Sequence, residues 1–203
     1  MKHLILTGFM GVGKSTVGPL VASQLKLPFI DSDQQFEKEF GLHSSSYIRR
    51  FGIRAFRKWE KQFLRKILSK QSLVLATGGG MVLQKTNVNR MNNKGYVVWI
   101  DVPLPLLLTR IKNAASRPLL PTPLTLKHLR EIFQERRASY KKCHLKVSST
   151  FEKPEKIANR ICQHYKEMVE NAGDSRARGA RGPFSGRRTP KRLAGPAFST
   201  IHY

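Results

Sequence analysis

A glycine-rich loop near the start of the chain carries the residues best suited to chemistry. Residues 8–15, Gly-Phe-Met-Gly-Val-Gly-Lys-Ser, fit the pattern G-x-x-x-x-G-K-[ST]. Its glycines adopt backbone dihedrals that let successive N–H groups turn inward around a phosphate. In such loops the lysine, here Lys14, bridges β- and γ-phosphate oxygens, and the hydroxyl of Ser15 binds Mg²⁺. The loop therefore predicts nucleotide binding and phosphoryl transfer.

The segments around this loop have the composition of a strand and a helix. Residues 2–7 form a short apolar run typical of a buried parallel strand. Residues 14–26 place Val17, Leu20 and Val21 at helical spacing. A helix that begins here would point its positive end at the bound phosphates.

The rest of the chain alternates further strands and helices. We expect strands at residues 28–30, 73–76, 96–100 and 144–147. We expect helices over residues 34–70 (broken near Gly41 and Gly52), 104–111, 125–140 and 154–169, with a loop over 116–123. The alternation predicts an α/β fold with a central parallel five-stranded sheet, and ligands that collect at the carboxyl edge of its strands.

Charge and composition divide the chain near residue 170. The net charge is +24, of which residues 171–203, with seven Lys or Arg and one Asp, supply 7 − 1 = +6. These last residues are rich in Gly, Pro, Arg and Ser without periodicity, which predicts a basic, disordered tail after a domain at 1–170. Most of the positive charge is expected to be solvated surface, and only a few arginines are assigned a function.

Several classes of protein are disfavoured. No apolar run is long enough to span a membrane, and no signal peptide is visible before the first strand. Cys143 and Cys162 lack metal-ligand spacing, so we expect two free thiols in the cytoplasm. The short chain and the lack of an NKxD motif argue against GTPases and motors. A small-molecule or nucleoside monophosphate kinase remains.

Five groups of residues together resemble the shikimate kinase family over residues 1 to about 168. They are the loop GFMGVGKSTVG; Asp31-Ser32-Asp33; Phe56-Arg57 with Glu60, followed by Gly78-Gly79-Gly80; Arg117-Pro118-Leu119-Leu120; and Glu135-Arg136 with Tyr140. Each group is weak alone, but their order and spacing are specific. The resemblance implies a three-layer P-loop fold like that of nucleoside monophosphate kinases, and transfer of the γ-phosphoryl group of ATP to the 3-hydroxyl of shikimate.

The resemblance also implies an acceptor site. Asp33 would bind the acceptor hydroxyls and act as base or orienting group, while Arg57 and Arg136 would clamp the carboxylate with their guanidinium forks. The backbone of Gly78, Gly79 and Gly80 would contact the acceptor ring. Asp31, together with Ser15, would hold Mg²⁺ through water, although an Asp at this position also suits a helix N-cap.

The nucleotide site is implied in the same way. Arg117 would act on the transferring phosphate from a lid, and Arg110 and Pro154 would contact the adenine. The full ATP set implied is Gly11, Val12, Gly13, Lys14, Ser15, Thr16, Arg110, Arg117 and Pro154. The catalytic residues implied are Lys14 and Arg117 of this set and Asp33 of the acceptor site. A cytoplasmic monomer is expected by resemblance.

One position departs from the family pattern, and other functions stay open. The family carries Gly-Glu shortly before Phe-Arg, whereas Gly52 is followed here by Ile53, which removes one expected support of Arg57.

A related sugar-acid kinase, such as one acting on gluconate, is the nearest alternative. A nucleic-acid-associated P-loop ATPase and a non-catalytic relic are weaker ones.

Overall fold

The sheet at the centre of the fold is entirely parallel. The computed structural model describes residues 2–112 and 123–179. Its strands are β1 (His3–Thr7), β2 (Phe29–Asp31), β3 (Val74–Ala76), β4 (Gly95–Asp101) and β5 (Leu145–Ser148). They are ordered β2-β3-β1-β4-β5, and all four pairings are parallel. The prediction of a five-stranded parallel sheet is confirmed.

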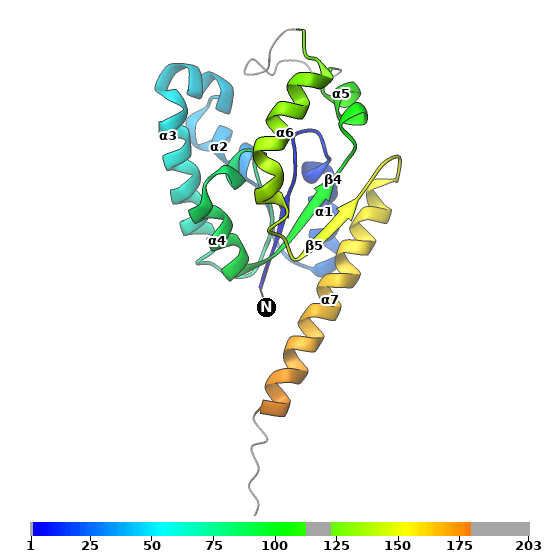
Figure 1. The fold of residues 1–203 in the computed structure, drawn as a ribbon. Coiled ribbons are helices and arrows are strands. Elements are labelled where there is room, and N and C mark those ends of the chain that lie inside the picture. Colours follow the sequence, from blue (N-terminus) through cyan, green and yellow to red (C-terminus); the bar gives the residue numbers. More distant parts are fainter. Residues whose placement is uncertain (1, 113–122, 180–203) are drawn as a thin grey trace, which may run out of the picture. The chain divides into compact units, whose positions relative to one another are not determined.

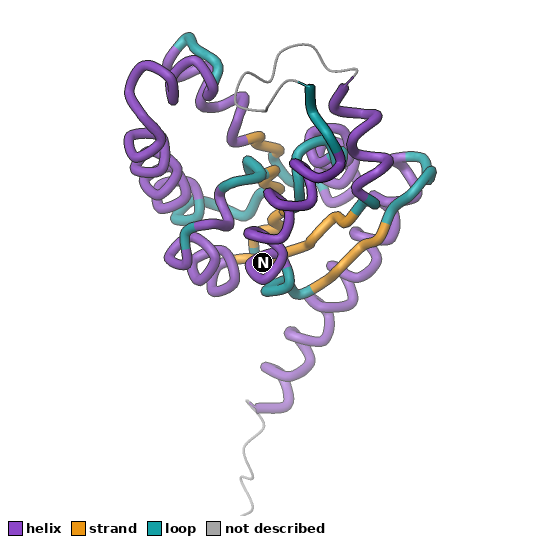
Figure 2. The backbone as a smooth tube through the Cα atoms, turned by 45° about the horizontal axis from the view of Figure 1, so that its top comes forward, coloured by secondary structure: helices purple, strands orange, loops and turns teal. Residues whose placement is uncertain are grey.

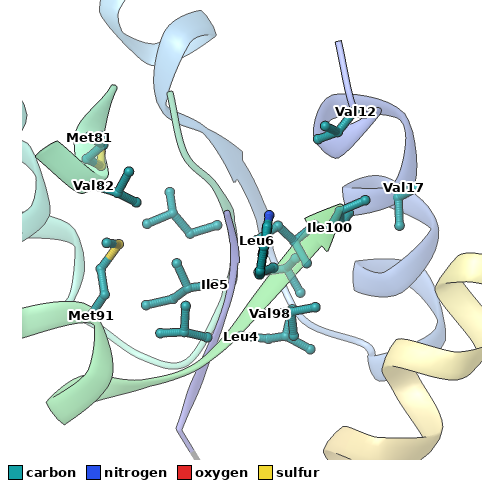
Figure 3. Close-up of a cluster of buried hydrophobic side chains, with 14 of the residues drawn as sticks. Leu4, Ile5, Leu6, Val12, Val17, Met81, Val82, Met91, Val98 and Ile100 are labelled. Carbon is teal, nitrogen blue, oxygen red and sulfur yellow. The ribbon is translucent and has the colours of Figure 1, made fainter. Parts of the chain in front are cut away.

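Helices cover both faces of this sheet (Figures 1 and 2). They are α1 (Lys14–Leu25), α2 (Ser32–Phe40), α3 (Ser44–Ile67), α4 (Lys85–Lys94), α5 (Leu104–Lys112), α6 (Leu126–Tyr140) and α7 (Pro154–Gly179), with a short 3₁₀ helix η1 (Met81–Leu83). In Figure 3, Met81 and Met91 approach one face of β1, and Val12 and Val17 lie across the other. The result is the predicted three-layer arrangement.

The core forms where the two helical layers meet the sheet. Every residue of β1 is buried, because this strand lies between β3 and β4 and under helices on both faces. Ile5 and Leu4 point to opposite faces, as alternating strand residues must (Figure 3). The central strand is thereby fixed, and so is the loop that leaves its carboxyl end.

Strand order brings three loops together at one edge of the sheet. The glycine-rich loop follows β1, Asp31 ends β2, and residues 77–80 follow β3, which pairs with both of the other strands. Parallel strands place all their carboxyl ends at the same edge. Segments far apart in the sequence therefore meet here.

The structure differs from the sequence-based expectations in two helices. No helix was predicted over residues 85–94, a polar stretch with few apolar residues, yet α4 forms there and buries Val88 and Met91. Helix α7 continues ten residues past the predicted end at Val169, so residues 171–179 are helical and were not expected to be.

The breaks expected near two glycines are present. Gly41 ends α2 at φ 65°, and Gly52 interrupts the helical dihedrals of α3 at φ 83°. The chain divides into two compact units, Met1–Val169 and Glu170–Tyr203. The basic tail stays a prediction for residues 180–203, which lie outside the described residues. Within residues 2–112 and 123–179, no helix has the length and apolar content needed to cross a bilayer.

The packing of β1 leads to a test of the core. Ile5 is fully buried, so Ile5→Ala leaves a cavity, and we expect the free energy of unfolding to fall by about 2–5 kcal/mol. Leu83→Ala is the control, because Leu83 is 42% exposed and should cost below about 1 kcal/mol. Urea unfolding measures both, and equal losses would contradict the assigned core.

Candidate active site

The glycine-rich loop has the backbone of a phosphate cradle. Gly8, Gly11 and Gly13 have φ values of 143°, 78° and 95°, which other residues rarely adopt. A Cβ on Gly8 would also lie 2.5 Å from the carbonyl oxygen of Ile100. Helix α1 begins at Lys14 directly after the loop, so its N-terminal N–H groups face the same space.

Two polar side chains of the loop are held by neighbouring groups. The Nζ atom of Lys14 is buried and donates hydrogen bonds to the carbonyl oxygens of Gly8 and Phe9, both at 2.9 Å. The Ser15 hydroxyl donates to Oδ2 of Asp31 at 2.6 Å. The cradle and the end of β2 are thus joined by one short hydrogen bond.

Asp31 has two structural tasks. While Oδ2 accepts from Ser15, its Oδ1 accepts from the backbone N–H groups of Asp33 (2.9 Å) and Gln34 (3.4 Å) and caps α2. Asp31 therefore caps α2 and accepts a hydrogen bond from Ser15 at the same time. Since Mg²⁺ prefers oxygen ligands and usually retains several waters, the hydroxyl and carboxylate suit it.

The three glycines after β3 are surrounded by the three predicted acceptor-binding side chains. A Cβ on Gly78 would lie 2.7 Å from Oδ1 of Asp33, and one on Gly80 would lie 2.5 Å from Nη2 of Arg57. A Cβ on Gly79 would lie 3.5 Å from Nη1 of Arg136 and 3.4 Å from the backbone nitrogen of Met10. The structure thus brings Asp33, Arg57 and Arg136 together beside the phosphate cradle.

Arg57 is oriented by Glu60 in the next turn of α3. Nη1 of Arg57 donates to Oε2 of Glu60 at 2.6 Å, and the Glu60 side chain is only 2% exposed. Burial raises the pKa of Glu60 to about 7, against the opposing effect of Arg57. Ile53, which replaces the family's acidic residue, is 46% exposed, so Glu60 is the support that Arg57 keeps here.

Arg136 is positioned by aromatic residues. Its guanidinium carbon lies 5.5 Å from the ring centre of Phe9, a residue of the cradle. One turn later on α6, the hydroxyl of Tyr140 donates to the carbonyl oxygen of Gly79 at 2.6 Å. Burial raises the pKa of Tyr140 to about 12, so this donor keeps its proton. The Nε atom of Arg136 is buried and has no hydrogen-bond partner among the described residues.

The remaining predicted residues fall into three groups. Val12 is buried in the cradle, and Thr16 is exposed on α1. Arg110 on α5 donates to the carbonyl oxygen of Thr150 at 3.2 Å, in the loop that leads to Pro154, the first residue of α7. Arg117 lies outside the described residues.

Two supporting residues were not predicted from the sequence. The Ser32 hydroxyl accepts from the N–H of Gly78 at 2.8 Å, and the amide of Gln84 donates to the carbonyl oxygen of Arg57 at 2.9 Å. Both contacts join segments distant in the chain, and neither residue stands in a pattern that indicates its partner. In the described part of the chain, no group of three or more His, Cys, Asp or Glu could hold a metal ion.

Comparison with known proteins identifies the family. The family model for shikimate kinase matches residues 10–166. The chain belongs to the shikimate kinase family. Curated shikimate kinases of Persephonella marina and Aquifex aeolicus are each 37% identical to it, over 79% and 78% of this chain and 97% and 93% of their own lengths.

Solved structures give the same assignment. A shikimate kinase from Acinetobacter baumannii in complex with shikimate matches with a TM-score of 0.78 and 31% identity, over 82% of this chain and 94% of that one. The Aquifex aeolicus shikimate kinase matches with a TM-score of 0.72 and 34% identity, over 82% and 98%. A gluconokinase from Sinorhizobium meliloti, with a TM-score of 0.53 and 14% identity over 86% and 97%, shares the fold alone.

The environment of Glu60 makes stability depend on pH. Its folded-state pKa of about 7 exceeds the ordinary value of 4.5, so the folded chain binds the extra proton more readily between these pH values. Stability from this group is therefore present below pH 4.5 and is lost as pH rises through 7. Relative to Glu60→Gln, we expect the wild-type free energy of unfolding to fall by about 3 kcal/mol from pH 4 to pH 8.

Urea unfolding of both proteins across that range measures this difference. If the free energy of unfolding changed with pH in the same way for the wild type and for Glu60→Gln, folding would not raise the pKa of Glu60.

Proposed function

We propose that this chain transfers the γ-phosphoryl group of ATP to the 3-hydroxyl of shikimate, giving shikimate 3-phosphate and ADP. The observation that carries the proposal is the meeting of two guanidinium groups and one carboxylate around Gly78–Gly80, next to the cradle. Membership of the shikimate kinase family, whose relatives match over nearly their whole length, supports the same reaction.

ATP would bind along the loop of residues 8–15. Inward-facing N–H groups of Gly11, Val12 and Gly13, with the start of α1 at Lys14–Thr16, would hold the β-phosphate. Lys14, whose ammonium now binds loop carbonyls, would neutralise β- and γ-oxygens. Arg110 and Pro154, joined through the Thr150 loop, would contact the adenine.

Mg²⁺ would be held by Ser15 and Asp31. What supports this is their direct 2.6 Å hydrogen bond, which places a hydroxyl and a carboxylate oxygen side by side at the cradle. A site with so few protein ligands is typical of Mg²⁺, which takes its other ligands from phosphates and water. The ion would supply neutralisation of charge that develops on the phosphates.

Arg57 and Arg136 would clamp the carboxylate of shikimate. A guanidinium fork matches a carboxylate in a bidentate manner. Both side chains are held before the acceptor arrives, Arg57 by Glu60 and Arg136 over Phe9. Preorganisation of this kind lowers the cost of ordering the site when substrate binds.

Asp33 would orient the attacking hydroxyl and accept its proton. Its support is its close approach to Gly78, which follows β3; this strand pairs with β1, from which the cradle leaves. A loose phosphoryl-transfer transition state requires little proton abstraction, so orientation is the larger part of this role.

Arg117 would stabilise charge on the transferring phosphate. From the family alone, we propose a cytoplasmic monomer.

An ADP-release assay with shikimate as acceptor tests the reaction directly. We expect turnover that depends on ATP, Mg²⁺ and shikimate together, and far less with gluconate. ATP binding without shikimate-dependent turnover would overturn the acceptor assignment and leave the nucleotide site intact. Turnover with gluconate instead would favour the sugar-acid kinase alternative.

Arg136→Ala separates the acceptor site from the nucleotide site. Loss of a charge-assisted contact should raise the KM for shikimate by at least about 30-fold and change the KM for ATP by less than about threefold. Arg65→Ala is the control, since Arg65 is an exposed arginine of α3 and should alter neither constant. Equal effects of Arg136→Ala on both KM values would count against the clamp.

Gly80→Ala tests the clamp without removing a charge. The new Cβ would lie 2.5 Å from Nη2 of Arg57, so the guanidinium must move, which also disturbs its 2.6 Å ion pair with buried Glu60. We expect the KM for shikimate to rise by roughly tenfold or more. An unchanged KM for shikimate would mean that the present position of the Arg57 guanidinium is not required for shikimate binding.

A further inference from the structure

A second concave site lies on the other flank of α6, away from the acceptor clamp. The cavity has a volume of about 610 Å³ and is bounded by α6, β5 and the carboxyl end of β4. We call it the α6–β5 groove. Ligand pockets are typically about 300–1,000 Å³, so a small metabolite would fit. Arg110 and Pro154, assigned above to the adenine, do not line it, whereas Ser149 and Thr150 of the loop that leads to Pro154 do.

Basic side chains dominate the lining. Arg130 and Arg137 stand on α6, and Lys141 is its C-cap; at positions i, i+7 and i+11, a helix of 3.6 residues per turn places all three on one face. They form a row about 16 Å long at 1.5 Å per residue. Lys146 on β5 also lines the groove, with its ammonium 4.8 Å from the ring centre of Trp99.

This charge is not neutralised within the described part of the chain. Arg130, Arg137 and Lys141 make no ion pair with a described residue, and only Lys146 does, to Asp101 at 2.8 Å. Four cations and one carboxylate give the lining a net charge of 4 − 1 = +3. Charges of one sign in a concave site focus the potential on an anion that enters it.

The inner wall is aromatic. Trp99 and Phe133 line the groove, and their ring centres are 6.5 Å apart. The indole N–H of Trp99 is buried and has no hydrogen-bond partner among the described residues, in a side chain only 4% exposed. The hydroxyl of Ser148 adds a polar group on the strand side. An apolar wall with a few polar groups is the usual composition of a metabolite site.

We propose that the α6–β5 groove binds a small organic bisphosphate, at a site separate from the active site. A single phosphate would engage only one part of the row, whereas two phosphates on one molecule would meet Arg130 at one end and Arg137, Lys141 and Lys146 at the other. The groove and the acceptor clamp use different faces of α6, since Arg136 lies beside Gly79 and Arg137 lines the groove.

Fructose 1,6-bisphosphate is the probe, measured by titration calorimetry on the full chain, first alone and then with MgADP and shikimate saturating. We expect one saturable site per chain, and at least tenfold weaker binding of fructose 6-phosphate. The measurement needs no turnover, so it stands apart from the test of shikimate phosphorylation. Absence of saturable binding, its abolition by MgADP, or equal affinity for the monophosphate would each overturn the proposal.

Matched double variants test the location. Arg137→Gln with Lys141→Gln should weaken the probe at least tenfold. Arg65→Gln with Lys66→Gln removes the same two charges from the last turn of α3 and should change affinity less than twofold. Equal losses would mean that the probe senses only the net charge of +24, and the groove would be rejected.

A spectroscopic readout keeps the test independent of these variants. The chain has two tryptophans, so its NMR spectrum contains two indole N–H signals, which Trp59→Phe assigns. The probe should shift the signal of Trp99 and leave that of Trp59 in place. A probe that shifts neither signal, or only Trp59, would contradict binding in the groove.

Discussion

The space that three glycines leave by having no side chain is the constraint on which the proposed acceptor site depends. Gly78, Gly79 and Gly80 hold no Cβ atoms, and Asp33, Arg136 and Arg57 each approach the positions where those atoms would be. Two positive groups and one negative group thereby gather within reach of a single small molecule. The glycines come directly after β3, which pairs with β1, so the same strand pairing fixes their distance from the cradle.

Aromatic packing holds these charges in place. Phe9 leaves the central strand and lies under Arg136, and its ring also meets Phe133 of α6 at 5.9 Å. On the other side, Phe36 of α2 contacts Phe56 and Trp59 of α3 at 5.0 and 4.8 Å. Cation–π contacts and buried rings hold arginine side chains that are otherwise flexible, so the entropy cost of ordering them is met during folding and not when a ligand binds.

Much of this arrangement could be predicted because it follows from local patterns. Short apolar strands, glycine breaks and the spacing of the glycine-rich loop indicated the sheet and the cradle, and the three charged residues were implied by the resemblance to the shikimate kinase family. Helix α4 was missed because its stability comes from burying Val88 and Met91 rather than from helical propensity in an Asn-rich stretch. Ser32 and Gln84 were missed because each bonds to a residue that is distant in the sequence and near only in the folded chain. The α6–β5 groove was missed for the same reason, since it is lined by segments that meet only in the fold.

The positive φ of Gly52 has a consequence for how the acceptor site is assembled. It divides α3 into an amino-terminal segment that carries Tyr47 and Phe51 and a carboxyl-terminal segment whose Phe56, Trp59 and Phe63 are buried. Arg57 and Glu60 both belong to the anchored segment. Gly52 therefore lets the chain change direction between residues 44–51, whose Tyr47 packs against Phe36 and Phe40 of α2, and the segment that carries Arg57.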